Sequence, residues 1–558
     1  MPGRIEPRST RAERSAQLAR VFDVLVVGGG ITGAGLALDL VARGLEVALI
    51  ERDDWACATS SASSRLVHGG LRYLEQLDLS LVRESCLERG LLLENAAGLV
   101  RPERFVFPVH RGGPVGRAKL LAGLALYTAV SVPRLLGLPR VLGRPAVRAA
   151  IPGIRSEGLV GGGSYLDAAT DDARLTLAVV TTASERGVIA LSRAELTALE
   201  ASSSSGVEAR VQDRLDGEER TVRARAVVLA GGPFTDELRG RAGLGGAGWL
   251  RPTRGSHITV PRRRLPTDGA VIHNSVVDGR ILFLIPWPRY TVVGTTDVDA
   301  PASEPIRATR EEVRYLLDSA NGLVPEAELT ESDVVSTWAG LRPLLADDDS
   351  APSARSREER VARDGPVYTI AGGKLTGYRA MAEKLGARIA RDLGRGDAAR
   401  KSPTRAIALT GARSAPVRRP EWSTLAGASP RIDRDPAGTA WSMRYGSLEA
   451  EVAAVCERTE EGRRAIDATT LLGEVDWAVA KEDCLTAVDF CFRRTDVGLE
   501  PEESVRAAVP LVIGRLASVL GWNAERRLSE ETALLAALDA RQAWRREGNA
   551  TSLPRPAP

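Results

Sequence analysis

Short apolar runs and helical spacing alternate near the start of the chain. Residues 24–27 form an unbroken apolar run, which predicts a buried parallel strand because strands covered on both faces lack polar alternation. Apolar residues recur at three- and four-residue spacing through residues 31–43 and predict a helix. A second run, residues 47–50, predicts another buried strand. The order strand, helix, strand is typical of a parallel α/β sheet.

Two later segments repeat the buried strand and end it in glycines. They are residues 223–236 and residues 367–386, and the second continues into a predicted helix from about Leu375. Residues 191–222 alternate in polarity, with turns at SSSSG and DG, which predicts an antiparallel meander. Three strand-to-glycine junctions, far apart in the chain, predict one extended cofactor that crosses a single sheet.

Beyond residue 400 the pattern is helical. Segments 448–458, 478–494 and 530–546 carry apolar residues at three- and four-residue spacing, so we expect a helical C-terminal domain over residues 401–558. Residues 1–20 carry charge throughout and lack an apolar core, and we expect them to form a disordered leader.

Composition narrows the class of protein. The 75 basic and 72 acidic side chains nearly cancel, to a net charge of +3, which argues against nucleic acid as a partner. The 5 cysteines show no C-x-x-C spacing and indicate a reducing cytoplasm. None of the 4 histidines is paired at zinc-binding spacing, so we expect no metal site.

One apolar segment, residues 120–132, lies between basic side chains that include Arg117, Lys119 and Arg134. It is shorter than the roughly 20 residues that a membrane-spanning helix needs. The segment is compatible with a helix that lies in a membrane interface, and also with a buried helix whose ends are solvated.

The first junction carries a dinucleotide fingerprint. Gly28, Gly30 and Gly33 stand in G-x-G-x-x-G register around Thr32, and Glu51 ends the second predicted strand. Such glycines allow a tight turn, the approach of a pyrophosphate to the helix N-terminus, and close packing of helix on strand. A carboxylate at position 51 suits ribose hydroxyls and disfavours a 2′-phosphate, so the fingerprint fits FAD or NAD.

Hydroxyl and glycine residues follow the second strand. The stretch CATSSASS, residues 57–64, offers hydrogen-bond donors to a phosphate-bearing ligand, and a plain polar loop is the alternative interpretation. In RLVHGGLRYLE, residues 65–75, paired glycines suit a flat ring system against the backbone, and an ordinary turn is the alternative. The cofactor-binding candidates of this region are Thr59, Ser60, Ser64, His68 and Gly70, with His68 expected to pack near the ring.

The later junctions add further cofactor-binding candidates: Gly231, Gly373, Lys374 and Leu375. A helix N-terminus at Leu375, aimed at the pyrimidine edge of a flavin, would stabilise the negative charge of the reduced ring. Lys374 would add to the same field, unless it is an ordinary surface lysine.

Eight motifs, in order between about residues 21 and 390, resemble the FAD-dependent (aerobic, quinone-linked) glycerol-3-phosphate dehydrogenase family. They are GGGITGAG, ACATSSASSRLVHGGLRYLE, DDARL, RGSHITVP, IPW, VVGTTD, LRPL and GGKLTGYR. The block at residues 56–75 is the most specific, and beyond residue 400 the likeness is weaker.

The resemblance implies an α/β fold with a Rossmann-type FAD-binding domain, an inserted substrate domain on a mixed or antiparallel sheet, and the helical C-terminal domain. The expected FAD-binding segments are about 21–100, 150–250 and 350–400. The expected substrate-domain segments are about 101–149 and 251–349.

The resemblance also implies an activity, the oxidation of sn-glycerol 3-phosphate to dihydroxyacetone phosphate by hydride transfer to FAD. Electrons would pass to a membrane quinone, and the protein would be bound peripherally to the inner face of the cytoplasmic membrane. The protein would also be able to form a homodimer. Matched to the family, the substrate-site residues are Arg72, His257, Arg342, Lys374 and Arg357. A guanidinium suits a phosphate dianion, and we expect His257 to take the hydroxyl proton.

Two alternatives stay open. A soluble oxidase would pass the electrons to oxygen, and a non-catalytic flavin module would dock onto a respiratory complex through its C-terminal helices. Two site residues also have purely structural interpretations. His257 would be a hydrogen-bonded histidine at the end of a strand, and Arg342 would brace a loop.

Overall fold

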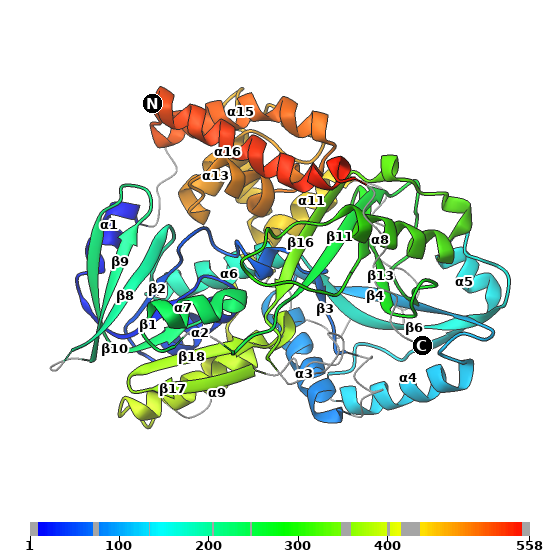
Figure 1. Cartoon of the computed structure of the whole chain (residues 1–558), viewed down its shortest axis with the longest axis horizontal. Helices are drawn as coiled ribbons and strands as arrows, with labels where there is room; N and C mark the ends of the chain where they lie inside the picture. Colours follow the sequence, from blue (N-terminus) through cyan, green and yellow to red (C-terminus); the bar gives the residue numbers. More distant parts are fainter. Residues whose placement is uncertain are drawn as a thin grey trace.

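Two β-sheets and a group of C-terminal helices make up the computed structural model (Figure 1). The structure describes residues 9–70, 78–132, 134–202, 206–245, 248–346, 359–398, 402–413 and 436–548. In the view of Figure 1 the sheets lie side by side, and α13 (Gly473–Glu482), α15 (Glu502–Leu520) and α16 (Ala524–Gln542) lie together along one side of them.

The first sheet has a parallel centre in the order β18-β10-β1-β2-β7, with β17 antiparallel to β18 at one edge. Strands β8 and β9 continue from β10 as an antiparallel meander. The strands are β1 (Val21–Val27), β2 (Val47–Ile50), β7 (Ile189–Leu191), β8 (Ala194–Ser202), β9 (Gly206–Asp213), β10 (Glu219–Leu229), β17 (Glu359–Asp364) and β18 (Val367–Gly372).

Alternate residues of β1 explain its unbroken apolar sequence. Val24 and Val26 pack in a core with α2 (Ile31–Ala42), α6 (Asp172–Glu185) and α9 (Tyr378–Asp392). Leu25 and Val27 face the opposite core, formed with the meander. Because both faces are covered, every position of the strand from Phe22 onward is buried.

The second sheet follows the order β15-β11-β14-β13-β12-β4-β6-β3, with β16 paired to β11 and β5 to β6. Its pairs are antiparallel except β12 with β4. The strands are β3 (Leu66–Val67), β4 (Val100–His110), β5 (Arg140–Leu142), β6 (Leu159–Thr170), β11 (Thr253–Pro261), β12 (Ala270–Asn274), β13 (Ile281–Pro286), β14 (Tyr290–Gly294), β15 (Val298–Asp299) and β16 (Ser336–Arg342).

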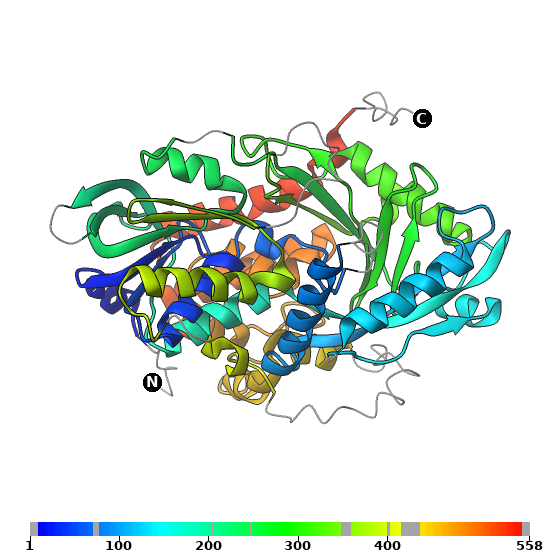
Figure 2. The ribbon, with the colours of Figure 1, turned by 90° about the horizontal axis from the view of Figure 1, so that it is seen from below.

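Further helices pack on the sheets or on the C-terminal helices, and Figure 2 shows α4 in light blue along the second sheet, beside α3. They are α1 (Arg11–Gln17), α3 (Leu79–Asn95), α4 (Arg117–Ser131), α5 (Arg144–Ala150), α7 (Thr235–Arg241), α8 (Arg310–Leu323), α11 (Pro436–Tyr445), α12 (Glu449–Cys456) and α14 (Ala487–Asp489). No helix among the described residues has the length and apolar character needed to cross a bilayer.

A buried ion pair ties the C-terminal helices to the loop after β2. Both terminal nitrogens of Arg494 donate to the carboxylate of Asp54 at 2.7 Å, and Arg493 Nε donates to Asp54 Oδ2 at 2.6 Å. Burial raises the pKa of Asp54, but the two guanidinium groups outweigh burial and hold that pKa at about 2. The helical part of the chain thereby fixes a loop that follows the dinucleotide fingerprint.

Most predicted elements near the fingerprint are present. Strand β2 has the predicted bounds, α2 ends one residue before the predicted helix, and β8, β9 and β10 form the predicted meander. Strand β1 begins three residues earlier than predicted, because polar Asp23 interrupts the apolar run although it is buried. The division into FAD-binding and substrate domains stays a prediction; β3 and β6 join the second sheet although they come from segments expected to bind FAD.

The predicted disordered leader is wrong for residues 9–20, while residues 1–8 lie outside the described part. Helix α1 begins with a capping box formed by Thr10 and Glu13. Its Arg11 donates to the carbonyl of Ser192 at 2.7 Å and to Asp213 at 2.9 Å. A charged side chain of this segment holds the helix in place through partners far along the sequence, and composition alone does not reveal those partners.

Candidate active site

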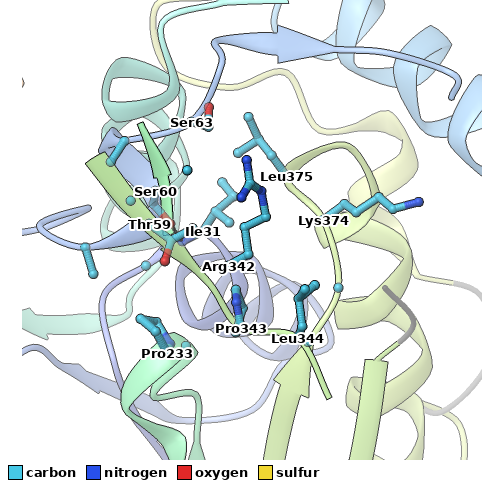
Figure 3. Close-up of a pocket in the computed structure, with 18 of the residues that line it drawn as sticks. Ile31, Thr59, Ser60, Ser63, Pro233, Arg342, Pro343, Leu344, Lys374 and Leu375 are labelled. Atoms are coloured by element: carbon cyan, nitrogen blue, oxygen red, sulfur yellow. Dashed lines mark hydrogen bonds between the residues drawn. The ribbon is translucent and has the colours of Figure 1, made fainter. Parts of the chain in front are cut away.

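A cavity of about 720 Å³ lies where the predicted glycine junctions meet the second sheet (Figure 3). The carboxyl ends of β1, β10 and β18 contribute one wall, and β11 and β16 contribute another. Ligands of open parallel sheets bind at the carboxyl ends of the strands. The three junctions, distant in sequence, therefore border one space, as the strand-to-glycine pattern predicts.

The glycines of the fingerprint have separate structural reasons. Gly28 has φ +117°, and a Cβ there would lie 2.3 Å from the carbonyl oxygen of Ala230, so strand β10 leaves no room for a side chain. A Cβ on Gly33 would lie 1.9 Å from the carbonyl oxygen of Gly28. Gly28 and Gly30 line the cavity, whereas Gly33 lies beneath it and allows α2 to pack on the turn.

The N-terminus of α2 opens toward the cavity. Gly30 is the N-cap and supplies no side-chain acceptor, and the Ile31 N–H donates to Ser60 Oγ at 3.0 Å. Gly30, Ile31 and Thr32 line the cavity together with Ser60. Helix N-termini carry partial positive charge and bind phosphate groups, so this end suits a pyrophosphate.

Glu51 lies at the end of β2 and is buried. Its carboxylate accepts the backbone N–H of Gly29 at 2.6 Å and of Asp53 at 2.8 Å. Burial raises the pKa of Glu51, and the two N–H donors oppose that rise. The side chain lines the cavity beside the fingerprint turn, the position from which it can accept hydrogen bonds from ribose hydroxyls.

The hydroxyl-rich loop forms the cavity wall between the sheets. Thr59, Ser60 and Ser64 all line the cavity, as does His68. Thr59 Oγ1 donates to the carbonyl of Leu341 at 2.6 Å, which ties the loop to β16. Gly70, predicted as a cofactor contact, is not among the residues that line the cavity; its φ is +79°.

The later junctions contribute the predicted residues Gly231, Gly373, Lys374 and Leu375 to the lining. Gly373 has φ +82°, and a Cβ there would lie 2.3 Å from Met381 Sδ. The predicted helix begins with the 3₁₀ turn Leu375–Gly377 and continues as α9.

His257 is a buried residue of β11 beside Trp338 of β16, and the two rings stack with centroids 5.0 Å apart. Its Nε2 lies 2.8 Å from Ser64 Oγ, and its Nδ1 has no hydrogen-bond partner in the described part of the chain. Burial first, then the charges of Arg342 and Arg65, lower the pKa of His257 to about 3. The imidazole is therefore neutral at physiological pH.

Arg342 ends β16 and lines the cavity with its guanidinium held in place. Nη1 donates to Asp297 Oδ1 at 3.0 Å, and Nη2 donates at 3.0 Å to Thr295 Oγ1 and to the carbonyl of Thr296. In the view of Figure 3 the guanidinium extends toward Ser63 and Leu375, while the amino group of Lys374 points in another direction.

Some site residues escape sequence reasoning, and two predicted ones cannot be placed. Arg72 and Arg357 lie outside the described residues. Thr295, Thr296 and Asp297 belong to the motif VVGTTD, whose position in the family pattern is a signal for a site role. Lys119 and Arg280 line the cavity without any motif that marks them.

The cavity can hold an extended dinucleotide, with a helix N-terminus and a carboxylate at one end and cations beside a neutral imidazole at the other. Such an arrangement is typical of dinucleotide-dependent oxidoreductases.

Comparison with known proteins agrees with this class. Residues 23–389 match the model of the FAD dependent oxidoreductase family, and residues 402–527 match the C-terminal domain of alpha-glycerophosphate oxidase. The chain belongs to the FAD-dependent oxidoreductase family, and FAD is its cofactor.

Several of its relatives are named as aerobic glycerol-3-phosphate dehydrogenases. Aerobic glycerol-3-phosphate dehydrogenase of Staphylococcus saprophyticus is 39% identical over 369 residues, which are 65% of this chain and 66% of that protein. The Staphylococcus aureus enzyme is 39% identical over 371 residues with the same coverage, so the match spans about two thirds of each relative. The solved structure of glycerol-3-phosphate dehydrogenase from Bacillus halodurans with FAD superposes with TM-score 0.76 and 30% identity, covering 95% of this chain and 97% of that one.

Proposed function

We propose that the protein oxidises sn-glycerol 3-phosphate to dihydroxyacetone phosphate and passes the electrons to a membrane quinone. One observation carries the proposal: His257 and Arg342 line the same cavity as the three glycine junctions. The names and FAD of the relatives support the same substrate and cofactor.

The glycines and Glu51 fit the adenine-nucleotide half of FAD, since Gly28, Gly30 and Glu51 line the cavity at the N-terminus of α2. When bound, FAD supplies the acceptor for the hydride from C2 of the substrate. We assign the backbone N–H groups around Gly373 and Leu375, two residues that line the cavity, to the ring end of the cofactor.

Arg342 is the proposed clamp for the substrate phosphate. A phosphate dianion in a partly desolvated pocket needs cations, and a guanidinium offers paired donors in a fixed plane. Asp297 and Thr295 hold that plane before the substrate arrives, which lowers the ordering cost of binding. Lys374, Arg72 and Arg357 complete the proposed set of cations around the substrate.

His257 is the proposed base for the C2 hydroxyl proton. A neutral imidazole can accept a proton, and the low pKa keeps the ring neutral in the free protein. Arrival of a phosphate dianion raises that pKa, because a nearby negative charge favours the imidazolium. Binding of the substrate itself thus makes the base stronger, and Nε2, now beside Ser64 Oγ, is the atom we assign to it.

Helix α4 is the proposed contact with the inner face of the cytoplasmic membrane. Leu120, Leu124 and Tyr127 are buried against the protein, while Leu121 and Leu126 are 38% and 37% exposed. Figure 1 shows α4 at the periphery of the molecule. A half-exposed apolar helix that starts at Arg117 suits a peripheral attachment, from which a quinone is within reach of the protein.

The test is anaerobic mixing of the FAD-loaded protein with sn-glycerol 3-phosphate. Loss of the oxidised flavin absorbance, and its return on adding a quinone analogue, is the expected result. Peroxide formed in air at the rate of turnover would favour an oxidase in place of the quinone-linked enzyme. A flavin that substrate never reduces would refute the enzymatic proposal and leave a non-catalytic flavin module.

A further inference from the structure

A second cavity, of about 290 Å³, lies behind the wall of the first. The loop that carries Cys57, Ala58 and Thr59 borders both cavities, and so does Gly340 of β16. The opposite wall comes from the C-terminal helices, through residues near the start of α14 and the end of α16. This space separates the cofactor loop from the helical part of the chain.

The lining of the second cavity is apolar with three arginines: Ile306, Val488, Phe492, Arg307, Arg493 and Arg541. Pockets for small organic ligands combine a mostly apolar surface with a few placed polar groups. None of the residues that line this cavity is acidic.

Two of the arginines already have carboxylate partners. Arg493 donates to Asp54 at 2.6 Å and also pairs with Asp489, and Arg307 lies 3.6 Å from Glu547. Asp54 and Asp489 are buried and further engaged by Arg494 and Arg193. Asp54 and Asp489 are therefore each paired with two arginines, and neither carboxylate lies in the cavity lining, where it could neutralise a further cation.

Arg541 is the exception. Within the described residues its side chain forms no ion pair and no hydrogen bond; its guanidinium lies over the ring of Phe492, 4.1 Å from the centroid. Burial first, then the charges of Arg493 and Arg65, lower the pKa of Arg541 to about 9. A half-buried guanidinium among other cations is unfavourable unless an anion joins it.

We propose that this second cavity is a binding site for a small organic monocarboxylate, whose acid group pairs with Arg541 and whose apolar body packs on Phe492, Val488 and Ile306. A single uncompensated cation matches a single negative charge better than it matches a dianion. The site is separate from the flavin cavity, so the proposal does not rest on the substrate assigned above.

Occupation of the cavity has a consequence for the flavin. Its occupant contacts Ala58 and Thr59 from behind, and the same residues line the cofactor cavity from the front. Binding there is therefore expected to shift the absorbance spectrum of the bound flavin without displacing it.

The test uses the FAD-loaded full-length protein and 4-iodobenzoate as the probe. Titration calorimetry is run with and without saturating dihydroxyacetone phosphate, which occupies the substrate site. We expect saturable binding that dihydroxyacetone phosphate leaves unchanged and that Arg541→Gln weakens about tenfold or more. The control Arg506→Gln removes a charge from the neighbouring helix, outside the cavity, and should leave binding unchanged.

Crystals of the wild-type holoprotein soaked in the probe give a result that does not depend on the variant folding. The anomalous signal of iodine is expected in the cavity beside Phe492. No binding, loss of binding when dihydroxyacetone phosphate is present, equal affinity in Arg541→Gln, or iodine located elsewhere would each overturn the proposal.

Discussion

Replacing Arg342 by lysine tests whether this residue grips the phosphate of the substrate. Lysine keeps the positive charge, but its single ammonium cannot bond Asp297 and Thr295 at the distances of 3.0 Å that now fix the guanidinium plane. The side chain loses its orientation, and with it the paired donors for a phosphate.

The expected magnitude follows from one charge-assisted hydrogen bond. Such a bond contributes about 1.5–3 kcal/mol, and each 1.36 kcal/mol changes a rate constant tenfold, so kcat/KM should fall roughly 10- to 150-fold. The assay is anaerobic stopped-flow reduction of the flavin over a range of sn-glycerol 3-phosphate concentrations.

Glycerol, which lacks the phosphate, serves as the second substrate. The slow reduction that glycerol supports should be nearly the same in Arg342→Lys and in the wild type. Arg251→Lys, at an exposed arginine outside the cavity lining, is the matched control and should change neither rate. An Arg342→Lys rate within twofold of the wild type, or an equal loss with both substrates, would show that Arg342 does not bind the phosphate.

Four further predictions concern other parts of the molecule. His257→Asn should lower kcat about 100-fold or more with little change in KM, because a base is lost and a phosphate contact is not; an unchanged rate in steady-state assays rules the assignment out. Gly33→Ala should abolish flavin retention on gel filtration, since its Cβ would meet the Gly28 carbonyl at 1.9 Å. Burial raises the pKa of Glu103 from 4.5 to about 7, so the folded state holds a proton that the unfolded chain releases; the contribution of Glu103 to stability should be full below pH 4.5 and fall by about 3 kcal/mol as the pH rises to 7, and Glu103→Gln should remove that part of the pH dependence in urea unfolding. Changing Leu121 and Leu126 to serine should reduce sedimentation with anionic vesicles while flavin reduction by substrate is kept; unchanged sedimentation would place the membrane contact elsewhere.

The sequence was most informative where structure depends on near neighbours along the chain. The strand, helix and strand from β1 to β2 follow from local periodicity. The burial of both faces of β1 follows from its sequence, since residues 24–27 are all apolar. The meeting of three glycine junctions could also be predicted, because parallel strands place their carboxyl ends at one edge.

Features that depend on distant partners could not be predicted from these patterns. The contact of His257 with Ser64 joins residues 193 positions apart, and it depends on how β11 approaches the cofactor loop. The low pKa of His257 comes from burial and from Arg342 and Arg65, none of which is visible in the local motif RGSH. Helix α1 was missed for the same reason, since Asp213 and Ser192 hold it from another region.

The ion pairs of Asp54 bear on attempts to shorten this protein. A fragment that ends near residue 400 would retain the dinucleotide fingerprint but lose Arg493 and Arg494, leaving a buried carboxylate alone behind the cofactor loop. Residues 1–400 produced on their own should therefore misorder that loop and take up little flavin, and during synthesis the cofactor should enter only after the residues beyond 400 have folded.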